Sequence, residues 1–170
     1  YHSGLNVDED NAPATDVQIV SGDNAATDFS SAWNDTDTEV DQFTLGDWNG
    51  VNASGDNYIA LLFATLDGIS KVGSYTGTGS PLTIDCGFSN GAAFVWIKRW
   101  DSTSTGDWIL FDSTRGIVAG NEPYLQTNTS NAQVTGNDYI DADPSGFTVN
   151  GGLADINANG GEYIFLAIAA

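Results

Sequence analysis

The chain has 170 residues, of which 41% are hydrophobic and 11% aromatic, enough apolar material for one folded core or two small ones. Its 23 acidic residues and 4 basic residues give a net charge of −19, which argues against binding to DNA, RNA or anionic lipid, because such surfaces require a basic face. This acidity is typical of a protein that remains dissolved in salty, marine-type surroundings. The alternative is that some of the acids bind divalent cations.

Short apolar runs separated by turn residues follow one another along the chain. Residues 14–20 alternate weakly and residues 43–45 are apolar at both ends, so both segments are candidate strands. Residues 58–64, Tyr-Ile-Ala-Leu-Leu-Phe-Ala, predict a strongly buried strand. The β-branched and aromatic runs 94–100 and 108–111, joined by a polar loop, predict an antiparallel hairpin. With 20 Gly and no sustained helical period, the chain is predicted to be all-β, an antiparallel, jelly-roll-like β-sandwich.

The sequence contains one Cys and one His, which limits the chemistry available to it. A single Cys excludes an intrachain disulfide, and Cys86 is expected to be a small buried residue. The only His is His2, at the start of the chain, so a Cys–His catalytic pair is not indicated. The chain has no Met and begins at Tyr1, which leaves open a processed end or a piece of a longer chain; we favour the second.

An internal repeat supports that preference. Residues 55–64 match residues 160–169, and the segment Val-Asn-Ala at 51–53 matches Ile-Asn-Ala at 156–158 at the same offset. Further upstream the match weakens: Phe-Thr-Leu before the first segment and Phe-Thr-Val before the second are shifted by one residue.

The repeat divides the chain into two unequal parts. Residues 1–66 are interpreted as a partial repeat unit, the back half of a sandwich unit; 67–72 as a joint; and 73–170 as a complete unit. A partial unit cannot cover the apolar run at 58–63. The missing front half lies upstream in a parent chain, another copy supplies strands, or the two parts merge into one sandwich; we favour the merged sandwich.

Several long motifs carry a family resemblance. They are Lys-Val-Gly-Ser-Tyr-Thr-Gly-Thr-Gly-Ser at 71–80, Ile-Asp-Cys-Gly-Phe at 84–88, Ile-Lys-Arg at 97–99, Asp-Trp at 107–108, Arg-Gly-Ile-Val-Ala-Gly-Asn at 115–121 and the run at 163–169. In these segments the chain resembles a tandem C-terminal repeat domain of tail-fibre-like and other virion structural proteins of marine bacteriophages. The resemblance implies a structural or receptor-facing role on the virion surface, and it provides no catalytic residues.

Five Trp residues are many for a chain of this length. Exposed Trp side chains stack on sugar rings, while acids and amides bind the hydroxyl groups. Trp48, in a Gly-Asp-Trp-Asn-Gly turn, is the best candidate for an exposed contact, followed by Trp33 and Trp100. For Trp96 and Trp108 we favour core packing.

The acids Asp35, Asp37, Glu39 and Asp41 alternate along one segment. On a strand they would share one face, and their mutual repulsion would be relieved by calcium, which accepts clustered carboxylates. Because no EF-hand spacing is present, a solvated loop is the favoured interpretation. Calcium is the one cofactor that the sequence leaves possible.

No P-loop, nucleophile elbow or His pair is present, and the chain is predicted not to be an enzyme. Paired carboxylates of a glycosidase are the remaining enzymatic alternative, but spacing selects no pair among so many acids. The first hypothesis is a virion structural module of a tail fibre or surface appendage. It would assemble with itself, most simply as a trimer, and with other virion proteins. The alternatives are a carbohydrate-binding module for host surface glycans and a calcium-stabilised extracellular domain.

Overall fold

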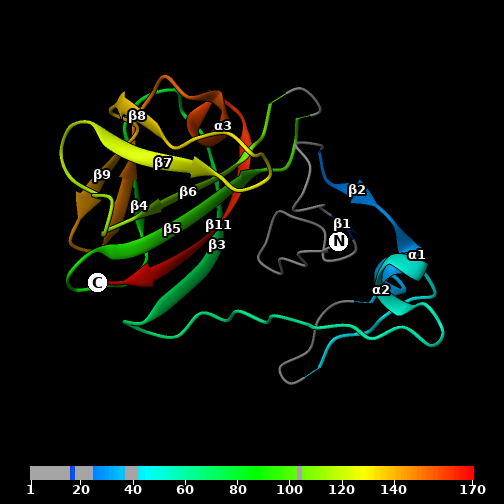
Figure 1. The fold of residues 1–170 in the computed structure, drawn as a ribbon. Helices are drawn as coiled ribbons and strands as arrows, with labels where there is room; N and C mark the ends of the chain where they lie inside the picture. Colours follow the sequence, from blue (N-terminus) through cyan, green and yellow to red (C-terminus); the bar gives the residue numbers. More distant parts are fainter. Residues whose placement is uncertain (1–15, 18–24, 37–41, 103–104) are drawn as a thin grey trace.

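Two antiparallel β-sheets packed on one another form the larger part of the molecule (Figure 1). The computed structural model describes residues 16–17, 25–36, 42–102 and 105–170. Six strands form the larger sheet in the order β3-β11-β5-β6-β7-β8, and three form the smaller sheet in the order β4-β10-β9. Every pairing within them is antiparallel, which confirms the predicted all-β, sandwich-like class.

The strands of both sheets come from the second part of the chain. The larger sheet contains β3 (Ser70–Thr76), β5 (Ala92–Arg99), β6 (Trp108–Asp112), β7 (Glu122–Gln126), β8 (Val134–Asn137) and β11 (Glu162–Ala169); the smaller contains β4 (Leu82–Asp85), β9 (Ile140–Asp143) and β10 (Gly146–Val149).

The predicted hairpin is present as β5 and β6, which pair from Phe94 opposite Asp112 to Lys98 opposite Trp108. Side chains alternate between the two faces of β5, and on the inner face Val95 and Ile97 are fully buried in the core between the sheets. Trp96, on the opposite face, packs against Trp108 with ring centroids 4.6 Å apart.

One hydrophobic core lies between the two sheets. Phe147 of the smaller sheet meets Phe165 of the larger sheet edge to face, with centroids 5.4 Å apart. Each large apolar side chain that is fully buried contributes roughly 1.5–3 kcal/mol. Gly146 permits the close approach of β10 and β4, because a Cβ at this position would lie 2.2 Å from the carbonyl oxygen of Ile84. Other buried members of the core are Val95, Ile97, Ile109, Phe111, Ile140, Val149, Ile156, Tyr163 and Ala167.

The last strand in sequence, β11, occupies a central place in the larger sheet. It pairs with β3 from Glu162 to Ile168 and with β5 from Tyr163 to Ala169. The helical turn α3 (Ala154–Asn157) precedes it and buries Ile156 and Asn157. Neither neighbour of β11 pairs directly with the other, so this strand joins β3 to the rest of the sheet.

The described residues of the first part form a smaller body beside the sandwich (Figure 1). It contains the short strands β1 (Asp16–Val17) and β2 (Thr27–Asp28), which pair with each other, and the helical turns α1 (Ser30–Trp33) and α2 (Asn49–Asn52). The amide of Ala26 donates to the carbonyl oxygen of Trp100, 2.7 Å away, at the end of β5.

Two of the sequence predictions concern the first part of the chain. The strand predicted at 43–45 is wrong, since these residues form no ladder; Phe43 instead packs against the small cluster of Ala32 and Trp33. None of the described residues before Ser70 belongs to a strand of the two large sheets. The division of the chain into a partial and a complete unit stays a prediction. Within the described ranges, no helix has the length and apolar character needed to cross a membrane.

Candidate functional site

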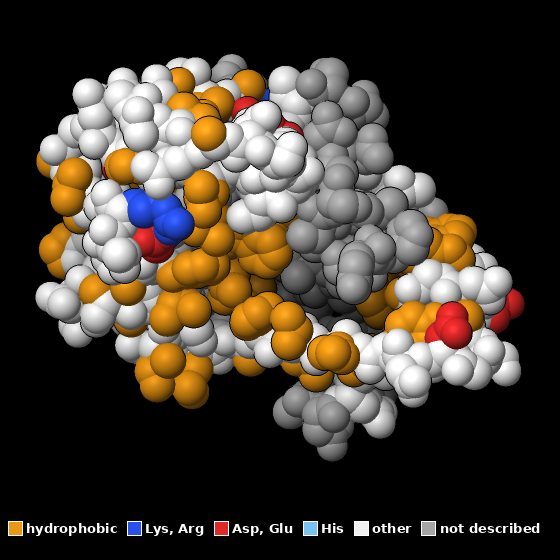
Figure 2. All heavy atoms as spheres, in the orientation of Figure 1, with side chains coloured by type: hydrophobic (Ala, Val, Ile, Leu, Met, Phe, Trp, Pro, Cys, Tyr) orange, Lys and Arg blue, Asp and Glu red, His pale blue; other side chains and the backbone are white. Residues whose placement is uncertain are grey.

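An extended apolar segment, residues 58–64, connects the small body to the sandwich; we call it the arm. It runs from the end of α2 toward β3 along the lower edge of the molecule in Figure 1, and Figure 2 shows hydrophobic side chains along that edge. Four of its side chains are largely exposed: Ile59 (92%), Leu61 (76%), Leu62 (74%) and Phe63 (49%). The prediction of a strongly buried strand here is therefore wrong.

The physical reason is that no other described segment lies beside the arm as a strand. Apart from the Ala64 carbonyl, which accepts from the Ser70 hydroxyl at 2.8 Å, no backbone group of the arm bonds to a described residue. A bridge between Leu66 and Ser70 then turns the chain into β3. An extended segment with open amides and carbonyls and an apolar surface has the features of a strand ready for pairing.

The first residue of the arm is held in place by its hydroxyl group. Tyr58 donates a hydrogen bond to the carbonyl oxygen of Asn49 (2.9 Å) and accepts one from the amide of Ala53 (2.8 Å). Asn52 adds a bond from its amide to the carbonyl oxygen of Gly46 (2.8 Å). These contacts fasten the arm to α2 and direct its backbone away from the small body.

The start of β11 has the same local geometry. The Tyr163 hydroxyl donates to the carbonyl oxygen of Ala154 and accepts from the amide of Ala158, both at 2.7 Å. The residues that follow the two helical turns also agree: Ala53 has φ −68° and ψ 137°, and Ala158 has φ −68° and ψ 143°. Gly55 and Gly160, at matching positions, both have positive φ, 87° and 76°.

What surrounds the two tyrosines differs. The Tyr163 ring is fully buried, stacks on Tyr75 of β3 at 4.9 Å and 14°, and lies 6.0 Å from the guanidinium carbon of Arg99 on β5. Tyr58 is 46% exposed, and no aromatic ring or cation of another described residue lies against it.

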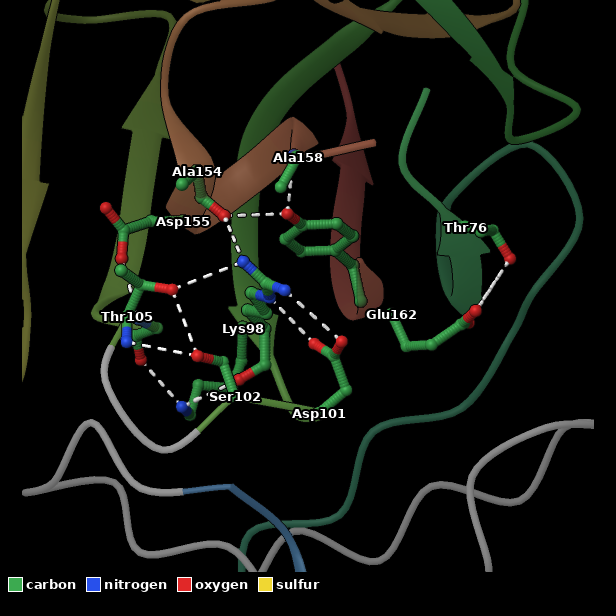
Figure 3. A network of polar contacts seen from close by, with 12 residues as sticks. Thr76, Lys98, Asp101, Ser102, Thr105, Ala154, Asp155, Ala158 and Glu162 are labelled. Atoms are coloured by element: carbon green, nitrogen blue, oxygen red, sulfur yellow. Dashed lines mark hydrogen bonds and ion pairs between the residues drawn. The ribbon is translucent and has the colours of Figure 1, made fainter. Parts of the chain in front are cut away.

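A polar network supports β11 at this end of the sheet (Figure 3). The guanidinium of Arg99 donates to Asp101 (2.7 Å), to the Thr105 hydroxyl (3.2 Å) and to the carbonyl oxygen of Ala154 (3.4 Å). Hydrogen bonding to Asp101 raises the pKa of Arg99 further above its ordinary value. Nearby, Asp155 accepts bonds from the amides of Gly106 and Asp107 at 2.7 and 3.0 Å. The network ties the β5–β6 loop to α3.

The structure brings two of the three sequence-selected tryptophans together. Trp33 is buried, and Trp48 packs against the cluster that contains it. Trp48 also meets Phe29 edge to face, with centroids 5.1 Å apart. Trp100 directly follows β5 and is not part of this cluster. Of the three, Trp33 is the least available for stacking on a ligand, because its burial serves the small body.

A hollow of about 480 Å³ opens in the small body. It is lined by hydroxyl, amide and carboxylate groups from α1, α2 and the residues before α2: Ser30, Ser31, Asn34, Asp35, Leu45, Gly46, Asp47 and Asn52. Trp48 adjoins it, since its amide donates to the carbonyl oxygen of Ser31 at 2.8 Å.

Only Asp35 of the four acids considered for calcium lies within the described residues; Asp37, Glu39 and Asp41 lie outside them. Asp35 is exposed and has φ 46° just after α1, so it occupies a turn and not a strand. Across the described ranges, no three His, Cys, Asp or Glu side chains are grouped so that they could hold a metal ion.

Two buried groups went unrecognised in the sequence. Glu122 is fully buried, its Oε1 accepts from the amides of Tyr139 (2.5 Å) and Ile140 (2.8 Å), and burial raises its pKa. Asn157 is also buried and bonds to two amides and three carbonyl oxygens. The only sequence signal for Asn157 is its repeat match to Asn52, which does not predict burial; Glu122 had none.

Cys86 is buried as expected, and burial raises the pKa of its thiol to about 12. At neutral pH it is therefore protonated, and a protonated thiol is a poor nucleophile.

Comparison with known proteins places the chain in a family. The chain belongs to the DUF7483 family, described as a domain of unknown function. The family model matches residues 2–170, so it includes the arm as well as the sandwich. No curated protein and no solved structure gives a significant match.

Proposed function

We propose that this chain is a non-enzymatic structural module of a bacteriophage virion, a β-sandwich of a tail fibre or other surface appendage of a marine phage. It assembles with copies of itself and with neighbouring virion proteins. The observation that carries the proposal is the exposed apolar arm. The motif resemblance at 71–121 and 163–169 supports the virion setting.

The apolar surface of the arm supplies part of the free energy that assembly needs. Full burial of a large apolar side chain yields roughly 1.5–3 kcal/mol, so the four exposed side chains yield at most roughly 6–12 kcal/mol. Association opposes this with roughly 4–15 kcal/mol of lost motional freedom. Because the two ranges overlap, stable assembly also requires tethering in a fibre or added backbone hydrogen bonds.

Charge sets the conditions for assembly. Copies that each carry a net charge of −19 repel one another at low ionic strength. The screening length falls from about 10 Å in 0.1 M salt to about 3 Å in 1 M salt. Assembly is therefore expected to strengthen as sodium chloride is raised toward seawater concentrations and beyond.

The test is the solution mass of the full chain by light scattering across a salt series. We expect a trimer or another defined assembly at high salt, and its loss in the arm variant Ile59→Asp. The matched control is Val118→Asp, which places the same charge on an exposed apolar side chain outside the arm. A monomer at every salt concentration, or equal effects of the arm and control variants, would contradict the proposal.

A second candidate function is recognition of host surface glycans, favoured by the polar hollow beside Trp48. Its hydroxyl, amide and carboxylate groups suit sugar hydroxyls, and Asp35 and Asp47 offer acceptors. Titration with a panel of host oligosaccharides, followed by Trp fluorescence, tests it. Binding that is abolished in Asp47→Asn and retained in Trp100→Phe supports this function; unchanged fluorescence with every sugar counts against it.

A further inference from the structure

We infer that the arm of one copy pairs, as an added strand, with the open edge of β3 in a neighbouring copy. The inference rests on the proposed function and deepens it. It keeps the arm as the site of self-assembly, and it names the surface of the second copy that receives the arm.

The receiving surface is the edge of the larger sheet that β3 forms. Strand β3 pairs with β11 on one side and with no described strand on the other. The amide of Ser70 donates to Leu66, and the backbone of Val72 bonds to the Thr65 hydroxyl, so both residues direct their backbone groups away from β11. In an antiparallel pair this direction recurs at every second residue, so the backbone groups of Ser74 face the same edge. None of the described residues bonds to them.

The arm offers matching backbone groups and an apolar surface. The amides and carbonyls of residues 59–63 have no partner among the described residues. A segment that adds to a sheet edge gains main-chain hydrogen bonds and buries its side chains against the neighbouring strands. On the outer face of the edge, Val72 is half-buried and Ile168 of β11 is 39% exposed, so apolar side chains of the arm find apolar surface to cover there.

Length and charge distinguish β3 from the other edges. The edge strands of the two large sheets are β3, β8, β4 and β9; β3 has seven residues and each of the others has four. Strand β3 contains Lys71 and no acid, whereas β4 and β9 each contain Asp and β8 has no charged residue. The arm is uncharged. Copies that each carry −19 therefore bring the arm to β3 without placing acids of these two segments against each other.

Contacts at both ends hold the arm away from its own β3. At one end, the Tyr58 hydroxyl bonds to the carbonyl oxygen of Asn49 and the amide of Ala53, beside α2. At the other end, the Thr65 hydroxyl bonds at 3.2 Å to both backbone groups of Val72, which a hairpin partner of β3 would need. Figure 1 shows the arm extending from the start of β3 to the small body. The strand that pairs with this edge therefore comes from a second copy.

The pairing joins two different surfaces, since each copy has one arm and one β3 edge. Contacts of this kind close into a ring when the rotation between copies allows it, and otherwise continue as a filament. A ring of three copies would be the trimer expected from the sequence.

The test is disulfide formation between two variants of the full chain, mixed at high salt. One chain carries Ser74→Cys, and the other carries Leu61→Cys or Leu62→Cys; Cys86 is buried. Adjacent arm side chains point to opposite faces, and only directly opposed side chains of paired strands approach closely enough for a disulfide. We expect one arm variant to crosslink at least about tenfold faster than the other. Val118→Cys, on an exposed side chain outside the arm, gives the rate of random collision.

A second measurement removes the edge donor itself. Ser74→Pro deletes an amide that faces away from β11, so it breaks no ladder bond within the sheet, and edge strands accept proline. We expect this variant to lose the salt-dependent assembly seen by light scattering. The matched control, Ser74→Ala, keeps the amide and should assemble as the wild type does. Circular dichroism verifies that both variants are folded, and equal assembly of the two would overturn the inference.

The outcomes separate this inference from the proposed function. Crosslinking between mixed chains at one arm position upholds the pairing, even where light scattering finds a monomer at every salt concentration and so contradicts the proposed function. Salt-dependent assembly with equal or background crosslinking at both arm positions would retain the proposed function and reject β3 as the partner. A disulfide that forms only when both substitutions are in one chain would assign the arm to its own β3 and would also overturn the inference.

Discussion

Tyr58 and Tyr163 place their hydroxyl groups in the same hydrogen-bonding arrangement, although one ring is half exposed and the other is fully buried. Tyr163→Phe removes two part-buried hydrogen bonds, one to the carbonyl oxygen of Ala154 and one from the amide of Ala158, and should lower the free energy of unfolding by about 1–3 kcal/mol. Tyr58→Phe should lower it by less than about 0.5 kcal/mol, because water reaches its partners. Urea denaturation followed by Trp fluorescence measures both, and equal losses would contradict this expectation.

A second matched pair is Asn157 and Asn52. The Asn157 amide group donates to the carbonyl oxygens of Ser80, Val149 and Asn150. In Asn157→Asp, a carboxylate oxygen would face these three carbonyls, and a loss of more than about 3 kcal/mol is expected. Asn52 donates to Gly46 alone and is exposed, so Asn52→Asp should lose less than about 1 kcal/mol. Thermal unfolding by circular dichroism compares the two, and a comparable drop in Tm would argue against the role assigned to Asn157.

Glu122 should make the stability of the sandwich depend on pH. Burial and the charges of Asp138 and Asp141 raise its pKa above the ordinary 4.5, so the folded state binds the proton more tightly than the unfolded chain. The stability from this group is fully present below pH 4.5 and is lost as pH rises through the raised pKa.

Glu122→Gln keeps an acceptor for the amides of Tyr139 and Ile140 without the titration. The Tm of the variant should therefore rise relative to the Tm of the wild type as pH increases from 4.5 to neutrality. A difference in Tm that stays constant across this range would refute the assignment. Asp67→Asn, a change at an exposed acid outside both sheets, serves as the control.

The Cys86 thiol should be unreactive toward a thiol-labelling reagent at pH 8 while the chain is folded, because it is buried and its pKa is raised to about 12. The same chain in concentrated guanidinium should react at once. The labelling rate under native conditions should follow the rate of unfolding, and it should rise in Tyr163→Phe. Immediate reaction of the native chain would show that the strand end beside Cys86 is open.

The sequence predicts the sandwich well because the pattern of apolar residues in each strand reflects how its two faces are buried. The β-branched and aromatic run of β5 and the apolar run of β6 predict a hairpin, and both strands lie where expected. The same kind of pattern gives a correct prediction for β5 and a wrong one for the arm. An apolar pattern indicates that a segment can be buried within a sheet, but it does not show whether neighbouring strands are present to bury it.

The candidate site was less predictable, because exposure depends on tertiary context. Trp33, chosen as a possible contact, is buried by Phe43 and Trp48, which come from a separate segment of the chain. Glu122 reads as an ordinary acid beside Pro123, and only the fold reveals that it is enclosed. The repeated Asn at 52 and 157 marks matching positions of the repeat, but only Asn157 is buried, so the repeat does not predict burial.

The position of β11 has a consequence for how the protein is made. Its neighbours β3 and β5 leave the ribosome well before residues 162–169, and the larger sheet stays divided until that last strand has been synthesised. During this interval β3 and β5 lack the strand that pairs with both of them. The order of synthesis therefore leaves two strands of the larger sheet without their shared partner, and the rate of elongation through residues 100–160 sets how long they remain so.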